Sequence, residues 1–366
     1  MLFRNFAILL TLPLFLAGCS QSPHTIGFIG SLTGVHADLG VAVRDGALLA
    51  VEQINAQGGI QGRPIEMLVR NDRYETQEAR TQARRLIESS GADIIIGFLT
   101  SGMLPAALDT AAAYQDRFII SPTISGRVPQ HNLPFIQLIG SARKQGRLLA
   151  EYARQQGSHT AVGIIDISNA VYTEEVMAGF TEEFSASSGR VLETRELQDT
   201  GFKDYTQLAE DLADSPHDVL VTALAAPDLA LLAQAVRITT RDDRQILSGM
   251  WAFTPELVIQ GGSAVDGVIL TSAIDPDSEN PRYKDFVHEY RAQYRSDPSF
   301  GAVLGYEAVL LAAELMQGSR EAPQSEDDGI AGFSGLQGRI QWLADRSVHR
   351  WYGLFRVDGG SFELLQ

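Results

Sequence analysis

The stretch IGFIGSLTG, at positions 26–34, decides the fold class of this chain. Its apolar part lies in the run Thr25–Gly30, which predicts a buried strand, and hydroxyl side chains stand in the loop Gly30–Gly34 that follows. A helix is expected over Leu39–Gln57, where one face collects Val43, Ala47, Ala50, Val51 and Ile54. The pair Gly58-Gly59 ends this helix, because glycine adopts the left-handed conformation that often follows a helix.

Similar units of strand, loop and helix follow along most of the chain. Further strands are predicted at Ile65–Val69, Ile94–Phe98, Phe118–Ser121, Ala161–Ile167, Val219–Thr222, Ile246–Gly249 and Gly267–Thr271. Most of these runs are continuously apolar, as in strands covered on both faces. The alternation predicts an α/β fold with parallel sheets flanked by helices, which bind ligands at the carboxyl ends of their strands. Near the C-terminus, Arg339–Leu343 and Trp351–Val357 are expected to pair as closing strands.

Composition limits the classes of function. The chain has 366 residues, enough for two or three domains, and 45% are hydrophobic, enough for a large core. Its formal net charge of -16 would repel phosphate backbones, so we expect no binding to nucleic acid. A single cysteine excludes a disulfide within the chain and a cysteine-based metal cluster.

The N-terminal segment has the features of a secretory signal. Arg4 precedes the apolar run Phe6–Leu16, which is shorter than the ~20 residues of a spanning helix. The sequence Leu16-Ala17-Gly18-Cys19 then resembles the lipoprotein box of bacteria, which implies a signal peptide over residues 1–18 and lipid on Cys19. Residues 19–24 would form a short tether to the membrane, and an ordinary signal peptide is the alternative. Which of two membranes would hold the anchor is left open.

Signatures of catalysis and of metal binding are mostly absent from the sequence. It contains no G-x-S-x-G elbow, no H-E-x-x-H helix and no phosphate-binding G-x-x-x-x-G-K-[ST] loop. The histidines are scattered, with no close pair at metal-ligand spacing. We therefore expect no enzyme, no metal and no cofactor, although a hydrolase with an unrecognised site remains an alternative.

Hydroxyl-bearing loops stand where several predicted strands end. The loop after the first strand contains Ser31 and Thr33, the segment Thr100-Ser101-Gly102 follows the third, and Ser121–Ser125 follows the fourth. Hydroxyls and backbone N–H groups at a helix start favour an anion, so a small carboxylate could bind there without a basic side chain. The alternative is that each hydroxyl only caps its helix.

These segments, taken in order, resemble the branched-chain-amino-acid-type periplasmic binding proteins, the solute receptors of ABC importers. The resemblance rests on the opening block, on INAQGGIQGR at 54–63, and on shorter matches, which are Asn71-Asp72, Gly97–Ser101, Ser121-Pro122-Thr123 and Gly305-Tyr306-Glu307-Ala308. It implies two Rossmann-like lobes that close on a ligand by a hinge. Lobe 1 would comprise 25–140 plus 275–331, and lobe 2 would comprise 141–274 plus 332–366. Crossovers are expected at Ile139–Ala142, Ser272–Pro276 and Gly329–Gly335.

The same resemblance implies the ligand site. In lobe 1, the ligand carboxylate would be held by hydroxyls and backbone amides of the residues Thr100, Ser101, Thr123 and Ser125. Ser101 is the strongest candidate, and Thr123 is expected to act through its backbone. In lobe 2, Tyr172 would cover the ligand with an apolar face and a hydroxyl, and Asn169 could add a hydrogen bond. Asp228, at the start of another loop, could simply cap a helix.

One segment departs from the family pattern. Amino-acid binders usually carry an acid after the strand that corresponds to Ile246–Gly249, whereas this chain continues with Met250 and Trp251. A buried ammonium without an anion is costly. Asp166 or another acid could replace the missing one, the Trp251 ring could supply a cation–π contact, or the ligand is no ordinary α-amino acid. Trp251 could also be a core residue, so amino acids, aromatic acids, amides and short peptides all stay open.

The leading hypothesis is therefore a lipid-anchored receptor in the cell envelope. It would capture a small carboxylate-bearing solute and pass it to the permease subunits of an ABC importer. A sensor that signals through a membrane protein, and a lipoprotein that regulates an envelope enzyme, are the alternatives on the same fold.

Overall fold

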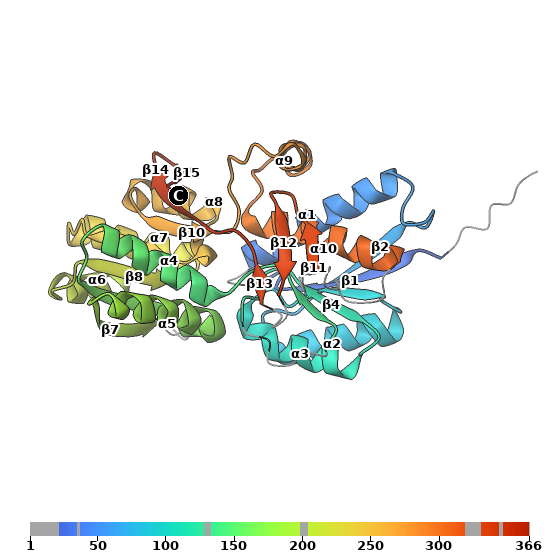
Figure 1. Ribbon diagram of the computed structural model, residues 1–366, viewed down its shortest axis with the longest axis horizontal. Helices are drawn as coiled ribbons and strands as arrows, with labels where there is room; N and C mark the ends of the chain where they lie inside the picture. The colour runs from blue at the N-terminus through green and yellow to red at the C-terminus, as the bar shows by residue number, and fades with distance from the viewer. Residues whose placement is uncertain are drawn as a thin grey trace, which may run out of the picture.

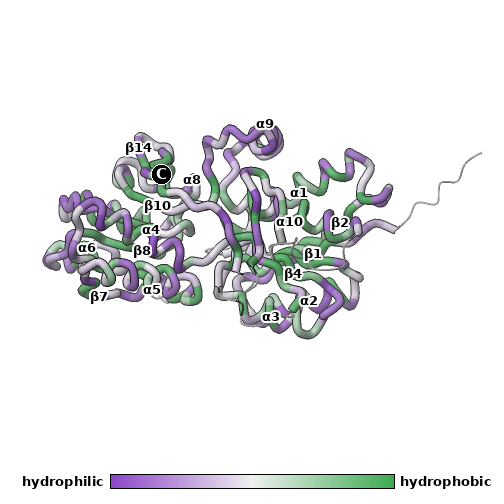
Figure 2. The backbone as a smooth tube through the Cα atoms, viewed as in Figure 1, coloured by the Kyte–Doolittle hydropathy of each residue, from purple (hydrophilic) through white to green (hydrophobic). Residues whose placement is uncertain are grey.

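The structure, a computed structural model, describes residues 22–34, 37–126, 128, 133–197, 204–318, 331–343 and 347–365. Two α/β lobes lie side by side, each built on its own sheet (Figure 1). The apolar strands run through the middle of each lobe and more hydrophilic segments surround them (Figure 2). The predicted signal peptide and Cys19 lie outside the described residues.

Lobe 1 contains a 5-stranded parallel sheet in the order β2-β1-β3-β4-β5. Its strands are β1 (His24–Gly30), β2 (Ile65–Asn71), β3 (Ile94–Gly97), β4 (Phe118–Ser121) and β5 (Phe135–Gln137). Its helices are α1 (Ala37–Ala56), α2 (Thr76–Arg84), α3 (Leu104–Ala113), α9 (Pro281–Tyr294) and α10 (Phe300–Gln317). Alternate residues of β3 face opposite sides, so Ile94 and Ile96 pack with α1 and α10, while Ile95 packs with α2 and α3.

Lobe 2 contains a 7-stranded sheet in the order β15-β14-β10-β9-β8-β6-β7. Its strands are β6 (Thr160–Asp166), β7 (Arg190–Leu197), β8 (Val219–Ala223), β9 (Gln245–Ser248), β10 (Ile269–Ser272), β14 (Gly353–Asp358) and β15 (Ser361–Leu364). Its helices are α4 (Ala142–Gln155), α5 (Ala170–Ala186), α6 (Tyr205–Ala213), α7 (Ala226–Gln234) and α8 (Pro255–Gly261). Strands β6 to β10 are parallel, whereas β14 and β15 add antiparallel pairs at one edge.

Short helical turns complete the two lobes. They are η1 (Arg85–Ser89), η2 (Ser101–Met103), η3 (Ile167–Asn169), η4 (Ala235–Thr239), η5 (Met250–Ala252) and η6 (Gly262–Val265). Of these, η2, η3 and η5 are the next elements after β3, β6 and β9, at the carboxyl ends of the strands. The predicted α/β class is confirmed.

Glycines allow the closest helix pair of each lobe. A Cβ atom at Gly46 of α1 would lie 1.9 Å from the carbonyl oxygen of Ala302 in α10. In lobe 2, a Cβ atom at Gly146 of α4 would lie 1.9 Å from the carbonyl oxygen of Val176 in α5. Both distances are impossible for a real side chain, so these helices touch through their backbones.

The predicted closing strand pair is wrong. The segment at 339–342 is β12 (Arg339–Trp342), which pairs with β11 (Ala331–Ser334) and β13 (Val348–His349) in a separate 3-stranded antiparallel sheet. The segment that contains β14 pairs instead with β10 and β15. The reason is long-range: β14 buries four of its six residues against lobe 2, while the Trp342 indole donates to the carbonyl of Gln137 at the end of β5.

The chain passes between the sheets near the predicted crossovers. It leaves β5 for α4 through residues 138–141, and it leaves β10 for α9 through residues 273–280. The last change of sheet falls between β13 and β14, later than the predicted crossover Gly329–Gly335, whose first two residues are outside the described part. The lobe boundaries of the sequence analysis stay a prediction.

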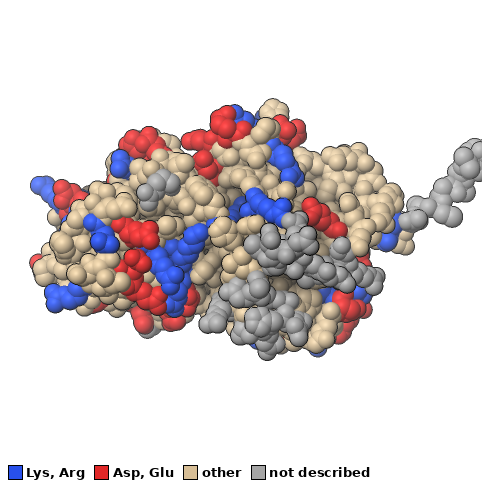
Figure 3. Space-filling view, in the orientation of Figure 1, with Lys and Arg blue, Asp and Glu red and all other residues tan. Residues whose placement is uncertain are grey.

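Helix α10 belongs to the core. Within the described residues it is the one helix that is long and apolar enough to cross a membrane, yet 72% of its apolar window is buried. The surface carries charge of both signs, interspersed over α4 and α5 on the face in Figure 3. There Arg143 pairs with Glu175 and Glu182, and exposed pairs of this kind contribute little to stability.

Candidate functional site

A small cavity of about 30 Å³ lies between the lobes, at the carboxyl ends of the strands. Every predicted ligand residue lines it, and the full lining is Leu39, Leu99, Thr100, Ser101, Thr123, Ser125, Ile139, Gln145, Asn169, Tyr172, Met250, Trp251 and Phe300. Space of this size holds about two water molecules. A solute the size of an amino acid can therefore enter only if the lobes move apart.

The lobe 1 wall presents neutral hydrogen-bonding groups. Ser101 begins η2 after β3, and its Oγ accepts a hydrogen bond from the backbone N–H of Ser125 at 3.2 Å. The two serine Oγ atoms lie 3.4 Å apart. The Oγ1 of Thr100 is buried and has no hydrogen-bond partner among the described residues. Such groups suit a carboxylate, because a buried hydroxyl without a partner gains a charge-assisted hydrogen bond from it.

Thr123 lies in the same wall, but its hydroxyl is already engaged. It donates to the carbonyl oxygen of Leu99, which leaves the backbone N–H as the group that Thr123 can offer to a ligand. No described residue accepts a hydrogen bond from that N–H. This arrangement agrees with the expectation that Thr123 acts through its backbone, and its role in binding stays a prediction.

The backbone is strained just before the hydroxyl residues of lobe 1. Phe98, fully buried, has a φ of 58°, which is unusual for a residue other than glycine. A conformation of this kind costs on the order of 1–3 kcal/mol and persists only where the surroundings impose it. Here it lies between β3 and the Thr100-Ser101 segment, which lines the cavity.

The lobe 2 wall is aromatic. The rings of Tyr172 and Trp251 lie 6.0 Å apart and meet edge to face at 83°. Burial raises the pKa of the Tyr172 hydroxyl, which stays protonated. That hydroxyl donates to Gln145 Oε1 at 2.8 Å and accepts from the backbone N–H of Trp251 at 3.3 Å. The ring of Tyr172, rather than its hydroxyl, is therefore what it offers to a ligand.

Gln145 is the residue of the wall that sequence reasoning missed. It is 1% exposed, and its Oε1 accepts hydrogen bonds from Tyr172, from the backbone N–H of Met250 at 3.0 Å and from Thr271 Oγ1 at 3.3 Å. Its Nε2 lies 3.4 Å from the hydroxyl of Tyr352. The sequence signal that could have indicated Gln145 is its position as a polar residue on the apolar, buried face of helix α4.

Asn169 joins the two lobes. Its Oδ1 accepts a hydrogen bond from the backbone N–H of Gly102, at 2.9 Å. Beside it, the hydroxyl of Tyr74 in lobe 1 donates to the carbonyl oxygen of Ser168 in lobe 2, also at 2.9 Å. These two contacts hold the lobes in a closed arrangement.

The acids that could balance a ligand ammonium lie elsewhere. Asp166 is 1% exposed, accepts from the backbone N–H of Ser168 at 2.8 Å and is not among the lining residues. Asp228 accepts a hydrogen bond from the hydroxyl of Tyr205, and it too is outside the lining. Among the described residues, no group of three or more histidine, cysteine or acidic side chains could hold a metal ion.

Comparison with known proteins agrees with this geometry. The family model described as periplasmic binding protein matches residues 23–359. A Leu/Ile/Val-binding protein homolog of Brucella melitensis is 25% identical over 320 residues, covering 86% of this chain and 83% of the relative. A leucine-, isoleucine-, valine-, threonine- and alanine-binding protein of Pseudomonas aeruginosa is 24% identical over 305 residues, covering 81% and 79%.

Solved structures share the fold. The substrate-binding protein LivJ of Streptococcus pneumoniae, in complex with isoleucine, superposes with a TM-score of 0.82 at 22% identity, covering 94% of this chain and 99% of that one. An ABC transporter solute-binding protein of R. palustris, in complex with benzoate, has a TM-score of 0.80 at 20% identity, covering 94% and 95%. With the family model matching most of its length, this chain belongs to the periplasmic binding proteins, a family of non-enzymatic solute-binding proteins.

Proposed function

We propose that this protein is the solute receptor of an ABC importer and captures a small carboxylate-bearing molecule, an amino acid or an aromatic carboxylate, between its lobes. The observation that carries the proposal is the cavity at the strand ends. One of its walls offers Ser101, Thr100 and the N–H of Thr123 as neutral donors, and the other offers the rings of Tyr172 and Trp251. Relatives named for amino-acid binding, and neighbours bound to isoleucine or benzoate, support the two ligand classes.

The mechanism follows from the geometry. With the lobes apart, the carboxylate would enter and accept hydrogen bonds from lobe 1, whose donors are held in place by packing and so need little reorganisation. Closure then brings the aromatic wall over the body of the solute and forms the contacts of Tyr74 and Asn169. The closed form would be the one that permease subunits recognise on the outer side of the membrane.

The proposal is tested by calorimetric titration of the purified protein with amino acids and aromatic carboxylates. Ser101→Ala should weaken binding by about 1–3 kcal/mol, because a buried carboxylate loses a charge-assisted hydrogen bond. The control is Thr81→Ala, which removes a hydroxyl that bonds to Gln77 on the surface of α2. Equal affinities for both variants would remove Ser101 from the site, and no binding by the unaltered protein would contradict the receptor proposal.

We also infer that the mature protein is held at the membrane by lipid on Cys19. Support comes from the sequence Leu16–Cys19 after an apolar run, at the place where a lipoprotein signal is cleaved. Several acyl chains anchor firmly, since each buried CH2 contributes ~0.8 kcal/mol. Cys19→Ser should move the protein out of the membrane fraction and leave solute affinity unchanged, and membrane retention of that variant would contradict the anchor.

A further inference from the structure

The cavity wall carries no formal charge within the described part of the chain. Its lining consists of apolar, aromatic, hydroxyl and amide side chains, without an acidic, basic or histidine residue among those described. The turn η5 after β9 contributes Met250 and Trp251, which are 2% and 8% exposed. A ligand group that carries positive charge would therefore meet no carboxylate from this wall.

The side-chain oxygens of the lobe 2 wall already accept hydrogen bonds from the protein. Gln145 Oε1 already receives hydrogen bonds from Tyr172, Met250 and Thr271. The hydroxyl of Tyr172 donates to Gln145 and accepts from the Trp251 N–H. Asn169 Oδ1 receives the N–H of Gly102. An ammonium group needs acceptors for its N–H bonds, and these side-chain oxygens of the lobe 2 wall already accept from donors of the protein itself.

Donors, in contrast, remain available on the opposite wall. The buried hydroxyl of Thr100 has no partner among the described residues, and the N–H of Thr123 donates to none of them. The serine pair of Ser101 and Ser125 adds two hydroxyl groups. The cavity is thus complementary to an anion at one end and to an uncharged, apolar body at the other.

We propose that the ligand is a carboxylate without an ammonium group, with an aromatic or branched aliphatic body, rather than an α-amino acid. This inference rests on the proposed function, since it assumes that the carboxylate binds at Ser101. A cation–π contact with Trp251 would not replace the missing anion, because such a contact is weaker than the cost of taking an ammonium group out of water.

The test compares ligands that differ only in the ammonium group. The pairs are 3-phenylpropanoate with L-phenylalanine and 4-methylpentanoate with L-leucine, each titrated into the unaltered protein by calorimetry. We expect the acid without the ammonium group to bind at least ~100-fold more tightly in a pair that binds. An amino acid that binds as tightly as its partner, or more tightly, would overturn the inference while leaving the receptor function intact.

A pair of variants tests whether the absence of a negative charge in the wall causes this preference. Trp251→Glu places a carboxylate in the wall and should shift the preference toward the amino acid by at least ~10-fold. Trp251→Gln removes the same ring without adding charge and should not shift it, so a shift in both variants would contradict the electrostatic explanation. If neither member of either pair binds the unaltered protein, the inference fails in this form, while the receptor function is decided separately by the wider titration with amino acids and aromatic carboxylates. The titrations of the unaltered protein decide the matter even if a variant does not fold.

Discussion

Gln145 connects the ligand cavity with the segments that join the lobes. Its Oε1 holds Tyr172 and the N–H of Met250, both of which line the cavity. Its Nε2 lies beside the hydroxyl of Tyr352, which donates to the carbonyl oxygen of Gly140 in the first crossover. A single amide side chain therefore links the aromatic wall to two of the segments that connect the lobes.

At this residue scale, Gln145→Leu should weaken both folding and binding. It leaves the donors of Tyr172, Met250 and Thr271 without an acceptor, at about 1–3 kcal/mol for each group that stays unsatisfied. Urea unfolding and calorimetry measure the two effects. Gln155→Leu, an exposed position on the same helix, is the control.

The variant Gln145→Glu distinguishes a role of Gln145 in positioning Tyr172 from a purely structural role. The neutral carboxyl group keeps an acceptor oxygen, so affinity should be largely restored at low pH. Affinity should fall as the pH rises and the group at 145 ionises, because a buried charge without a partner is costly. Solute affinity that stays independent of pH in this variant would argue against Gln145 as the residue that positions Tyr172.

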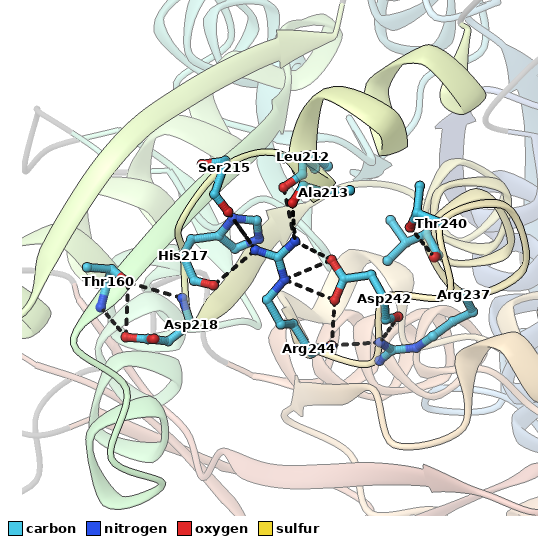
Figure 4. Close-up of polar contacts among 11 residues, drawn as sticks. Thr160, Leu212, Ala213, Ser215, His217, Asp218, Arg237, Thr240, Asp242 and Arg244 are labelled. Carbon is cyan, nitrogen blue, oxygen red and sulfur yellow. Dashed lines mark hydrogen bonds and ion pairs between the residues drawn. The ribbon is translucent and has the colours of Figure 1, made fainter.

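At the scale of elements, a guanidinium group holds the segment before β9 in place. Arg244 forms an ion pair with Asp242 and donates to the carbonyl oxygens of Leu212 and Ser215 (Figure 4). Its Nη1 also lies 3.0 Å from Nδ1 of His217. An arginine can only donate, so this contact requires His217 Nδ1 to be the acceptor of a neutral ring.

The stability of this segment should depend on the protonation of His217. Burial, and then the charge of Arg244, lower the pKa of His217 below its usual 6.5. The unfolded chain therefore takes up the proton first, and the stabilisation from the neutral ring is present above pH ~6.5 and lost as the pH falls below it. Urea unfolding at neutral and mildly acidic pH measures this loss. His217→Gln should lose less stability over this range, and an equal loss in both proteins would contradict the linkage.

A buried ion pair joins helix α10 of lobe 1 to the segment that leads into β14 of lobe 2. Glu307 of α10 is 0% exposed and Arg350, just before β14, is 6% exposed, with Oε2 and Nη1 2.7 Å apart. Glu307 also accepts from the backbone N–H of Leu336, and Arg350 donates to the carbonyl oxygen of Leu138 in the first crossover. The pair therefore attaches the first crossover and the segment before β14 to helix α10 of lobe 1.

Glu307→Gln should destabilise the fold by about 3–5 kcal/mol, because it leaves the guanidinium of Arg350 buried without its counter-charge. Asp109→Asn removes the carboxylate of an exposed pair with Arg80 and should cost about 0–1 kcal/mol. Denaturant unfolding measures both. A similar decrease in the free energy of unfolding for the two variants would show that the buried pair contributes no more to stability than the exposed one.

At the scale of the whole molecule, closure depends on few polar contacts. The lobes have separate sheets, and the hydroxyl of Tyr74 and the amide oxygen of Asn169 cross between them beside the cavity. A hydrogen bond contributes only about 0.5–1.5 kcal/mol net, so such contacts bias the closed form without making it permanent. A bound solute that touches both walls can then shift the population toward closure.

Tyr74→Phe should increase the dissociation rate of the solute by about 2–10-fold, since it removes the hydrogen bond to Ser168 and favours opening. Tyr114→Phe is the matched control, because its hydroxyl bonds to Glu88 on the surface of lobe 1. Stopped-flow displacement measures the rates, and small-angle scattering with and without solute measures closure. Identical dissociation rates for both variants would mean that this contact does not hold the lobes together.

The sequence by itself determined the fold class and the positions of the loops around the cavity. Continuous apolar runs such as Ile94–Phe98 predict strands buried on both faces, and a hydroxyl loop after such a run must lie at a strand end. Both are local properties, read from neighbouring residues. For that reason Ser101, Ser125, Tyr172 and Trp251 could all be placed on one cavity from the sequence and the family resemblance.

Only the tertiary structure decided which groups of that cavity are still available. The Tyr172 hydroxyl is taken by Gln145, a residue 27 positions away, and Asn169 is shared with Gly102 of the other lobe. Likewise, β12 could not be paired correctly from its own pattern. Its neighbours are β11 and β13, and its Trp342 donates a hydrogen bond to Gln137, which is 205 positions away. Hydrogen-bond partners and strand neighbours that are distant in sequence depend on how the lobes pack, which local periodicity does not encode.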